Sequence, residues 1–390
     1  MIPAHEQGEL GRRLVGSGLL GPEWIRAFEQ VPRSLFLPDV MWPFGEDGEY
    51  HVADRSADPA DWRRWAFSDV PIVTQWDDGR HSGDSPGDEP TSSGSMPTLV
   101  FSMFRDLDVR DGARVLEIGT GTGWCAGLLS ARLGDRQVVS VEVDGRVADA
   151  ARRALAAAGR EPSVLTGDGA DGRPPGAPYD RILVTAGVRE VPAAWPAQTR
   201  PGGVIVLPWG TPYSQHDAIV RLVVGRDGTA AGRFTGGAGF MKLREQRGAW
   251  PEHEAYLPGG AWPAGVRESE TTLRLEEVTG TVEWFVGLRV PRAVHTVHAG
   301  DDGTRTLLLY GLGDRSWAAV FFCADGCREF LVYQDGPRNL WDEVRDAVQW
   351  WADLGRPDVT RFGMTVSPGG QAVWLDSPQE APVALGSPRV

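Results

Sequence analysis

Residues 115–124 read VLEIGTGTGW, and this stretch decides the fold of the chain. A short apolar run ends here, and glycines follow at alternate positions: Gly119, Gly121 and Gly123. Residues 125–133 then have the composition of a helix. A strand, a glycine turn and a helix in this order form the first unit of a nucleotide-binding α/β sheet. Because glycine lacks a Cβ atom, it permits the tight turn and lets a ligand lie against the backbone.

The spacing of the glycines narrows the choice of cofactor. A dinucleotide-binding turn has the pattern G-x-G-x-x-G, but its third glycine position is occupied here by Trp124. The E-x-G-x-G-x-G pattern that begins at Glu117 instead resembles motif I of class I S-adenosylmethionine (SAM) methyltransferases. The next predicted strand carries Glu142, about where an acidic side chain binds ribose hydroxyls in such sheets. Asp168 and Gly169 follow the third strand. The alternative is a glycine-rich turn that binds no ligand.

The bulk composition excludes several classes of protein. A net charge of −14 disfavours a nucleic-acid partner held through phosphates, and it suits a peptide or a small molecule. No run approaches the ~20 apolar residues of a membrane span, and no secretory h-region is evident, so we expect a cytoplasmic protein. Of the three cysteines, Cys323 and Cys327 could in principle share a metal, but no second Cys or His pair stands at ligand spacing, so we expect two buried or free thiols. His295 and His298 lie on opposite faces of a predicted strand, so no metal site is expected.

Three regions are predicted along the 390 residues. Residues 1–97 form a helical covering segment with a substrate loop. Residues 98–249 form the α/β cofactor domain, with strands at 138–143, 163–166, 180–184, 204–207, 218–225 and 233–243. Residues 250–390 form an α+β accessory domain, with strands predicted at 271–278, 281–289, 306–310, 317–322 and 329–334, a helix at 339–354, and a closing hairpin at 362–366 and 371–375.

Residues 77–97 are rich in Gly, Ser, Asp and Pro, which is typical of a loop. The loop ends directly before the helix predicted at 98–107, which leads into the glycine strand. A long loop in a compact domain is usually functional or disordered. The hydroxyls of Ser93 and Ser95 are candidates to hold a substrate carboxylate. Equally, they would serve as caps of the following helix.

Several segments together resemble one family. VPRSLFLPD at residues 31–39, SGSMP at 93–97, LEIGTGTGW at 116–124 and YDRILVTAG at 179–187 are similar to motifs of protein-L-isoaspartate O-methyltransferases. The resemblance covers about residues 22–245. It implies a Rossmann-like class I SAM methyltransferase domain and a peptide substrate. By position it assigns the cofactor-binding residues as Glu117, Gly119, Thr120, Gly121, Gly123, Glu142, Asp168 and Gly169, and the substrate-loop residues as Ser93 and Ser95.

The departures from that family lie on the substrate side. The family loop reads Gln-Thr-Ile-Ser, whereas this chain has Ser92-Ser93-Gly94-Ser95 after an extra polar insertion. Gly187 stands where the family usually has a second alanine after Thr185-Ala186. Methyl transfer to a carboxylate needs no strong base, because an Asp side chain ionises near pH ~3.9, so positioning dominates the chemistry and no catalytic triad is expected.

The added C-terminal region and the altered loop resemble methyltransferases of actinobacterial modified-peptide (lanthipeptide and graspetide) pathways. This resemblance implies methylation of an aspartate in a cyclised ribosomal peptide, which leads to an aspartimide or isoaspartate. The alternatives are a repair-type protein-L-isoaspartate (D-aspartate) methyltransferase, a small-molecule carboxyl methyltransferase and a non-catalytic SAM-binding module. The oligomeric state is left open.

Overall fold

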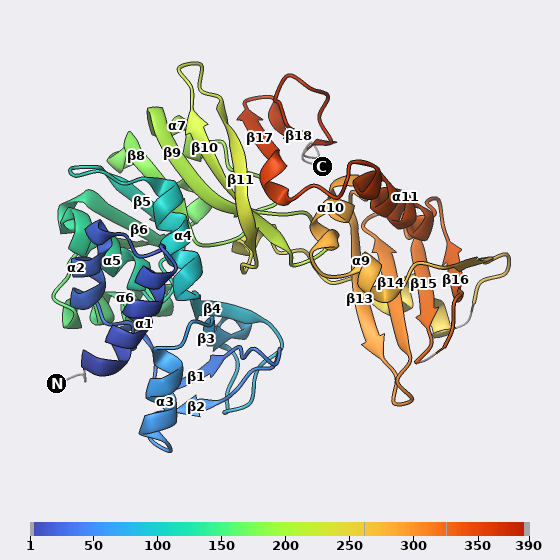
Figure 1. Ribbon diagram of the computed structural model, residues 1–390, viewed down its shortest axis with the longest axis horizontal. Coiled ribbons are helices and arrows are strands. Elements are labelled where there is room, and N and C mark those ends of the chain that lie inside the picture. The colour runs from blue at the N-terminus through green and yellow to red at the C-terminus, as the bar shows by residue number, and fades with distance from the viewer. Residues whose placement is uncertain (1–3, 261, 325, 386–390) are drawn as a thin grey trace.

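A computed structural model describes residues 4–260, 262–324 and 326–385. Its largest sheet has ten strands and runs through the centre of the molecule (Figure 1). In order from one edge of the sheet to the other, the strands are β19 (Ala384–Leu385), β18 (Gly370–Leu375), β17 (Phe362–Ser367), β11 (Ala230–Ala238), β10 (Asp217–Val224), β9 (Thr199–Trp209), β8 (Tyr179–Val184), β5 (Val115–Ile118), β6 (Val138–Glu142) and β7 (Ser163–Thr166).

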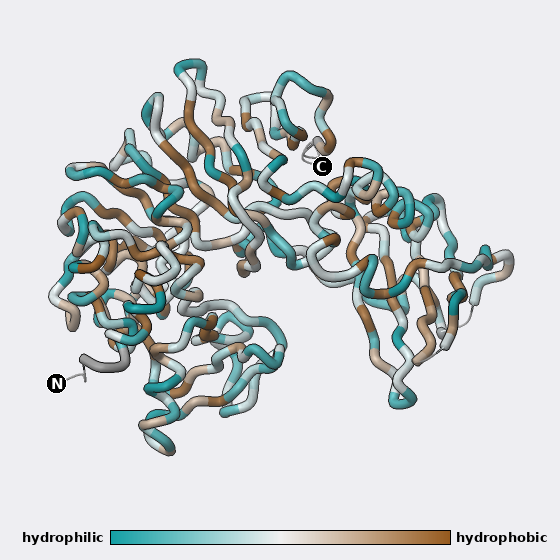
Figure 2. The backbone as a smooth tube through the Cα atoms, viewed as in Figure 1, coloured by the Kyte–Doolittle hydropathy of each residue, from teal (hydrophilic) through white to brown (hydrophobic). Residues whose placement is uncertain are grey.

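Strands β5 to β9 pair in parallel, and the remaining strands of this sheet pair antiparallel. The chain order reverses between β5 and β8, which creates the crevice where α/β sheets bind ligands. The predicted α/β class is therefore confirmed. Apolar residues concentrate along the central strands in Figure 2. One apolar core joins this sheet to α1 (Ala4–Gly16), α2 (Pro22–Gln30), α4 (Pro97–Leu107), α5 (Trp124–Leu133) and α6 (Gly145–Ala157).

A smaller sheet precedes the central one in the sequence and lies beside α3 (Pro59–Ala66). Its strands, in spatial order, are β2 (Ala53–Asp54), β1 (Val40–Pro43), β3 (Ile72–Trp76) and β4 (Pro90–Gly94). The sequence predicts a loop over residues 77–97, but its last part is β4, where Ser93 pairs with Val73. The polar composition hides this strand, because β4 is held by backbone pairing rather than by an apolar face.

The C-terminal part of the chain forms a third, five-stranded antiparallel sheet. Its strands are β12 (Arg267–Thr271), β16 (Phe330–Asp335), β15 (Trp317–Phe322), β14 (Arg305–Gly311) and β13 (Ala293–Ala299). The sheet shares an apolar core with α9 (Leu275–Val278), α10 (Val282–Arg289) and α11 (Leu340–Asp353). The predicted strands of β14 to β16 and the helix predicted at 339–354 are confirmed. Two short helices, α7 (Ala194–Ala197) and α8 (His253–Tyr256), complete the fold.

Two predicted strands are wrong. The segment predicted as a strand at 281–289 contains helix α10 (Val282–Arg289), and the segment 271–278 contains only the end of β12 followed by helix α9. The valines and aromatics of α10 favour a strand by propensity, but tertiary packing overrides that preference. Helix α10 is buried from Val282 to Leu288. Trp284 and Phe285 pack against the core of the central sheet, while Val282 and Val286 pack into the core of the C-terminal sheet.

The closing hairpin forms as predicted, but it does not belong to the C-terminal sheet. Strand β17 pairs with β11, so β17 and β18 extend the central sheet (Figure 1). Residues 250–390 therefore leave the central sheet, form a separate sheet and return. Because the chain returns to the central sheet, the predicted domain boundary at residue 250 stays a proposal.

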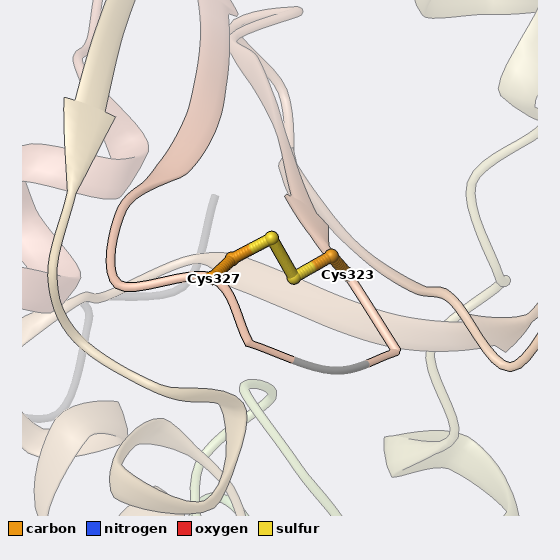
Figure 3. The surroundings of a disulfide bond; sticks show 2 residues. All are labelled: Cys323 and Cys327. Carbon is orange, nitrogen blue, oxygen red and sulfur yellow. A yellow bond between two sulfur atoms is a disulfide. The ribbon is translucent and has the colours of Figure 1, made fainter.

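Cys323 and Cys327 are joined by a disulfide bond between β15 and β16 (Figure 3), so the expectation of free thiols is wrong. Antiparallel pairing of β15 with β16 brings the two residues together. Cys125 is a free, buried thiol. Within the described ranges, none of the helices has both the length and the apolar composition that a membrane crossing needs.

Candidate active site

A cavity of about 990 Å³ lies at the carboxyl ends of the parallel strands. Its walls come from the glycine turn after β5, the end of β6, strand β4 and the segment after β11. The volume lies at the upper end of the range for cofactor sites. The cavity brings together eight of the predicted site residues: Ser93, Ser95, Gly119, Thr120, Gly121, Glu142, Asp168 and Gly169.

The glycine turn needs its glycines for two separate reasons. Gly119, Gly121 and Gly123 all have positive φ values, of 88°, 52° and 91°, which disfavour residues with a Cβ atom. A Cβ atom at Gly121 would also lie 3.3 Å from the backbone oxygen of Ser93 on β4. The glycine turn therefore lies directly against strand β4. Gly123 does not line the cavity; it packs against Ala151 of α6 instead.

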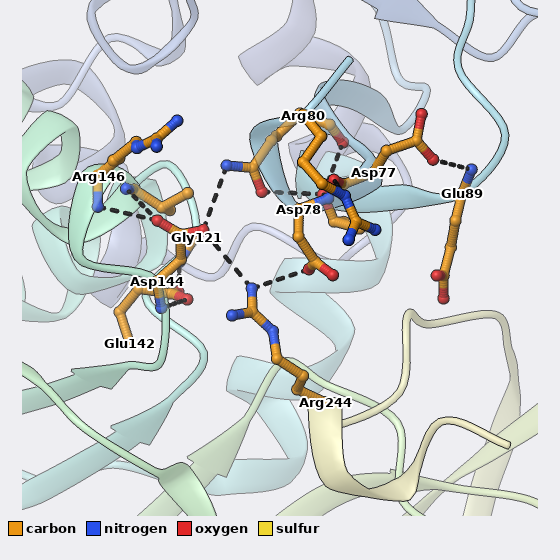
Figure 4. A network of polar contacts seen from close by, with 12 residues as sticks. Asp77, Asp78, Arg80, Glu89, Gly121, Glu142, Asp144, Arg146 and Arg244 are labelled. Carbon is orange, nitrogen blue, oxygen red and sulfur yellow. Dashed lines mark hydrogen bonds and ion pairs between the residues drawn. The ribbon is translucent and has the colours of Figure 1, made fainter. Parts of the chain in front are cut away.

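Glu142 ends β6 with its carboxylate turned toward the glycine turn. Its Oε2 accepts a hydrogen bond from the backbone N–H of Gly121 at 2.9 Å, and its Oε1 accepts one from Asp144 at 3.1 Å. Burial raises the pKa of Glu142, and these backbone donors oppose that shift. Arg244 lies nearby, between Asp78 and Asp144, at 2.9 Å and 3.5 Å (Figure 4). The strand-end carboxylate is therefore held in place beside the turn.

Asp168 and Gly169 follow β7, the strand that pairs with β6, and they also line the cavity. Asp168 Oδ1 accepts a hydrogen bond from the backbone of Ala170 at 2.8 Å, and Trp195 donates to the Gly169 oxygen at 2.9 Å. A Cβ atom at Gly169 would lie 2.5 Å from Ile118. Only glycine therefore lets this turn approach the end of β5.

Glu117 does not reach the cavity. Its side chain is fully buried behind the turn, where Ser140 Oγ donates to its Oε2 at 2.5 Å and in turn contacts Thr120 Oγ1 at 2.6 Å. Burial raises the pKa of Glu117 to about 8, so this carboxyl is neutral at pH 7. The structure gives Glu117 a supporting position beneath Thr120. Its predicted role in cofactor binding stays a proposal.

Ser93 and Ser95 line the cavity from β4 and the residue after it. The alternative role as helix caps is not observed. Met96 occupies the N-cap position of α4 and makes no side-chain cap, while the backbone N–H of Thr98 donates to Asp69 Oδ1 at 2.9 Å. Both serines line the cavity instead.

Sequence reasoning missed Arg33. Its buried guanidinium donates to the backbone oxygens of Ser68, Val70, Gly94 and Ser95 at 2.9–3.0 Å. Burial lowers its pKa to about 10, so it stays charged. Arg33 therefore fixes the backbone of the Ser93–Ser95 segment. The only signal was one charged side chain inside the apolar VPRSLFLPD segment.

The geometry fits SAM. The glycine turn leaves backbone space for the methionine part, and the carboxylate of Glu142 lies where ribose hydroxyls bind in such sheets. The described residues contain no group of three or more His, Cys, Asp or Glu side chains arranged to hold a metal. Fold and site together define a class I SAM-dependent methyltransferase.

Comparisons with known proteins agree. Residues 62–246 match the family model for protein-L-isoaspartate(D-aspartate) O-methyltransferase. The chain is 32% identical over 244 residues to the protein-L-isoaspartate O-methyltransferase of Thermococcus onnurineus, covering 62% of this chain and 93% of that one. The Methylorubrum extorquens enzyme of the same name is 41% identical over 221 residues, covering 55% and 78%. The chain belongs to the protein-L-isoaspartate O-methyltransferase family, and its cofactor is SAM.

A solved structure also shares the fold. A protein-L-isoaspartate O-methyltransferase superimposes with a TM-score of 0.53 at 22% identity, covering 95% of this chain and all of that one. At this level of identity the likeness shows the fold alone, and it extends over nearly the whole chain.

The division of labour between Glu142 and Ser95 is testable by substitution. We expect Glu142→Ala to weaken SAM affinity about tenfold or more, because a charged hydrogen-bond acceptor is lost, and Ser95→Ala to slow methyl transfer while SAM affinity stays within about twofold. Calorimetry and single-turnover kinetics measure the two effects. The exposed Glu161→Ala variant is the matched control for charge. Equal loss of SAM affinity in both variants contradicts the assignment.

The neutral state of Glu117 predicts a pH effect on stability. Between the pKa of the unfolded chain, about 4.5, and the folded value of about 8, the folded state holds one proton more. The contribution of the neutral Glu117 to the free energy of unfolding is thus complete below pH ~4.5. It is lost as the pH rises toward the folded pKa, by at most about 1.4 kcal/mol per pH unit. The glutamine of Glu117→Gln cannot ionise. The free energy of unfolding of this variant, measured by urea titration, should therefore rise relative to that of the wild type as the pH increases from 5 to 8. Parallel profiles contradict a neutral Glu117.

Proposed function

We propose that this protein transfers the methyl group of SAM to the free carboxylate of an L-isoaspartyl residue in a peptide or protein. Membership of the family supports this function, since the Thermococcus relative of that name is matched over 93% of its length. The single structural observation that carries the proposal is the cavity itself. It runs without interruption from the glycine turn to the Ser93–Ser95 segment, so donor and acceptor sites are adjacent.

The residues present suit a reaction governed by positioning. SAM supplies an electrophilic methyl group on a sulfonium, and a carboxylate arrives already ionised, so no general base is required. The hydroxyls of Ser93 and Ser95 orient the carboxylate, and Arg33 holds their backbone. The apolar side chains of Ile118, Leu99 and Met96 also line the cavity and exclude water.

The cavity favours a peptide over a small acid. Beyond the cofactor side it continues to the half-exposed Phe44 and to Tyr50, whose rings lie 4.9 Å apart at the N-terminal sheet. Such aromatic surface suits the side chains that flank an isoaspartyl residue. The cavity lining ends at Gly248 among the described residues, so the C-terminal sheet does not contribute to it.

A second candidate is methylation of a normal aspartate in a cyclised ribosomal peptide. The altered loop favours it, because the inserted segment supplies Asp88 and Glu89 to the cavity wall next to Ser93. A substrate that differs from a linear isoaspartyl peptide is the simplest reason for such an insertion. The methyl ester would then be attacked by the next backbone amide and close to an aspartimide.

A direct comparison of substrates separates the two candidates. The protein is incubated with SAM and, in parallel, an isoaspartyl peptide, its normal aspartyl isomer and a cyclised precursor peptide with a normal aspartate. Methyl ester is quantified by mass spectrometry. We expect methylation of the isoaspartyl peptide and not of its linear isomer. Methylation of the cyclised peptide alone contradicts the isoaspartyl proposal and supports the second candidate; methylation of a free dicarboxylic acid in preference to every peptide contradicts both.

A further inference from the structure

Arg189 is a cation in the cavity wall, and the described residues give it no ion pair. It follows the Thr185-Ala186-Gly187 segment after β8, and its partly buried side chain lines the same cavity as Ser93 and Ser95. Its Nε is buried and has no hydrogen-bond partner, and no carboxylate of the described residues lies within 4 Å of the guanidinium. An arginine stays protonated in such a position, so an unmatched positive charge faces the cavity.

The charged neighbours of Arg189 do not neutralise it. Lys242, which also lines the cavity, donates to Asp217 Oδ2 at 2.6 Å, and both side chains are almost fully buried. Asp217 is thus already paired. Two cations and one anion leave one positive charge in this group. A buried charge is costly unless it is paired, so this part of the wall, around Arg189, has the electrostatics of a site that receives one carboxylate.

The departure at Gly187 makes this arrangement possible. A Cβ atom at Gly187 would lie 2.7 Å from Asp217 Oδ2 and 3.0 Å from Lys242 Nζ. An alanine at this position would push the ion pair out of place. The glycine, the ion pair and Arg189 therefore belong to one local arrangement on the substrate side.

The backbone of Arg189 is fixed from three directions. Gln371 of β18 donates to the Arg189 oxygen at 2.6 Å and accepts from Val191 N–H at 2.9 Å. Trp209 donates to the same oxygen at 2.9 Å, and Gln246 accepts from the Arg189 N–H at 2.7 Å. The side chain therefore projects from a rigid loop, and one of its supports comes from the C-terminal hairpin.

We propose that Arg189 binds the acceptor carboxylate of the substrate and that Gln371 is a positioning residue for Arg189. This inference rests on the proposed function. It identifies how an anionic acceptor is recognised in a cavity where Ser93 and Ser95 offer only neutral donors. A planar guanidinium matches a carboxylate and leaves an oxygen lone pair free to attack.

The charge balance of the reaction defines the expected kinetic effect. A carboxylate oxygen forms a bond to the methyl carbon while the bond between sulfur and that carbon breaks, and the electron pair stays on sulfur. The carboxylate becomes a neutral ester, the sulfonium becomes a neutral thioether and no proton moves. The ion pair with Arg189 is thus stronger before transfer than after it. Its loss should raise KM much more than it lowers kcat.

A thermodynamic cycle tests the contact directly. The wild type and Arg189→Gln are titrated, in the presence of S-adenosylhomocysteine, with an isoaspartyl peptide and with the same peptide carrying an amide in place of the free carboxylate. The wild type should prefer the carboxylate about tenfold or more, and Arg189→Gln should bind both peptides within about twofold of each other. Full discrimination by Arg189→Gln overturns the proposal.

Three further variants separate recognition from folding. Arg189→Lys keeps the charge without the planar fork and should show an intermediate preference. Arg153→Gln removes an exposed charge on α6 outside the cavity and should discriminate as the wild type does. Gln371→Leu should raise the peptide KM with SAM affinity unchanged, whereas Gln349→Leu, on the exposed face of α11, should not. An unchanged KM in Gln371→Leu overturns the positioning role.

Failure of this inference is distinguishable from failure of the proposed function. If the wild type methylates only normal aspartyl peptides, the function is revised and the cycle is run with that peptide and its asparagine counterpart. If the wild type methylates the isoaspartyl peptide and the cycle shows no coupling, the function stands and the role of Arg189 is rejected.

Discussion

The site depends on the close approach of three backbone segments at the carboxyl end of β5. The glycine turn passes beneath the backbone of Ser93, and a Cβ atom at Gly119 would lie 3.0 Å from Thr185 Oγ1. A Cβ atom at Gly119 or Gly121 would have little room, so the turn packs directly against β4 and against Thr185, which follows β8 and donates its hydroxyl to the Gly119 oxygen at 2.6 Å. That contact brings the cofactor crevice and strand β4, which carries the proposed substrate residue Ser93, to the same place. Two other interactions hold the segments that meet here. Glu142 accepts a hydrogen bond from the glycine turn, and Arg33 donates to the backbone at the end of β4.

The C-terminal region is linked to the site through the central sheet. Helix α10 packs with one side in the core of the central sheet and with the other in the core of the C-terminal sheet. The chain then returns through β17 and β18, and Gln371 reaches the loop that carries Arg189. The five-stranded sheet itself does not line the cavity among the described residues. The C-terminal region therefore reaches the cavity wall through Gln371 of the hairpin.

The sequence predicted the parts of the fold that depend on local signals. The glycine turn, the strand-end acid and the parallel strands follow from spacing, because backbone conformation there demands particular residues. Strand β4 and helix α10 could not be predicted in this way. Strand β4 lacks an apolar face, and helix α10 lacks a polar face, so neither shows the alternation typical of its element. Arg33, Arg189 and the disulfide of Cys323 with Cys327 were missed or misjudged for another reason. Their roles depend on partners distant along the chain or on strand pairing, which no local pattern records.

The most direct measurement is a crystal structure of the protein with S-adenosylhomocysteine. Our account predicts the ribose hydroxyls within hydrogen-bonding distance of Glu142 and the homocysteine part against the backbone of Gly119 and Gly121. It also predicts the sulfur facing the space between Ser95 and Arg189. A ligand bound outside this cavity, or a sulfur turned away from that space, would contradict it.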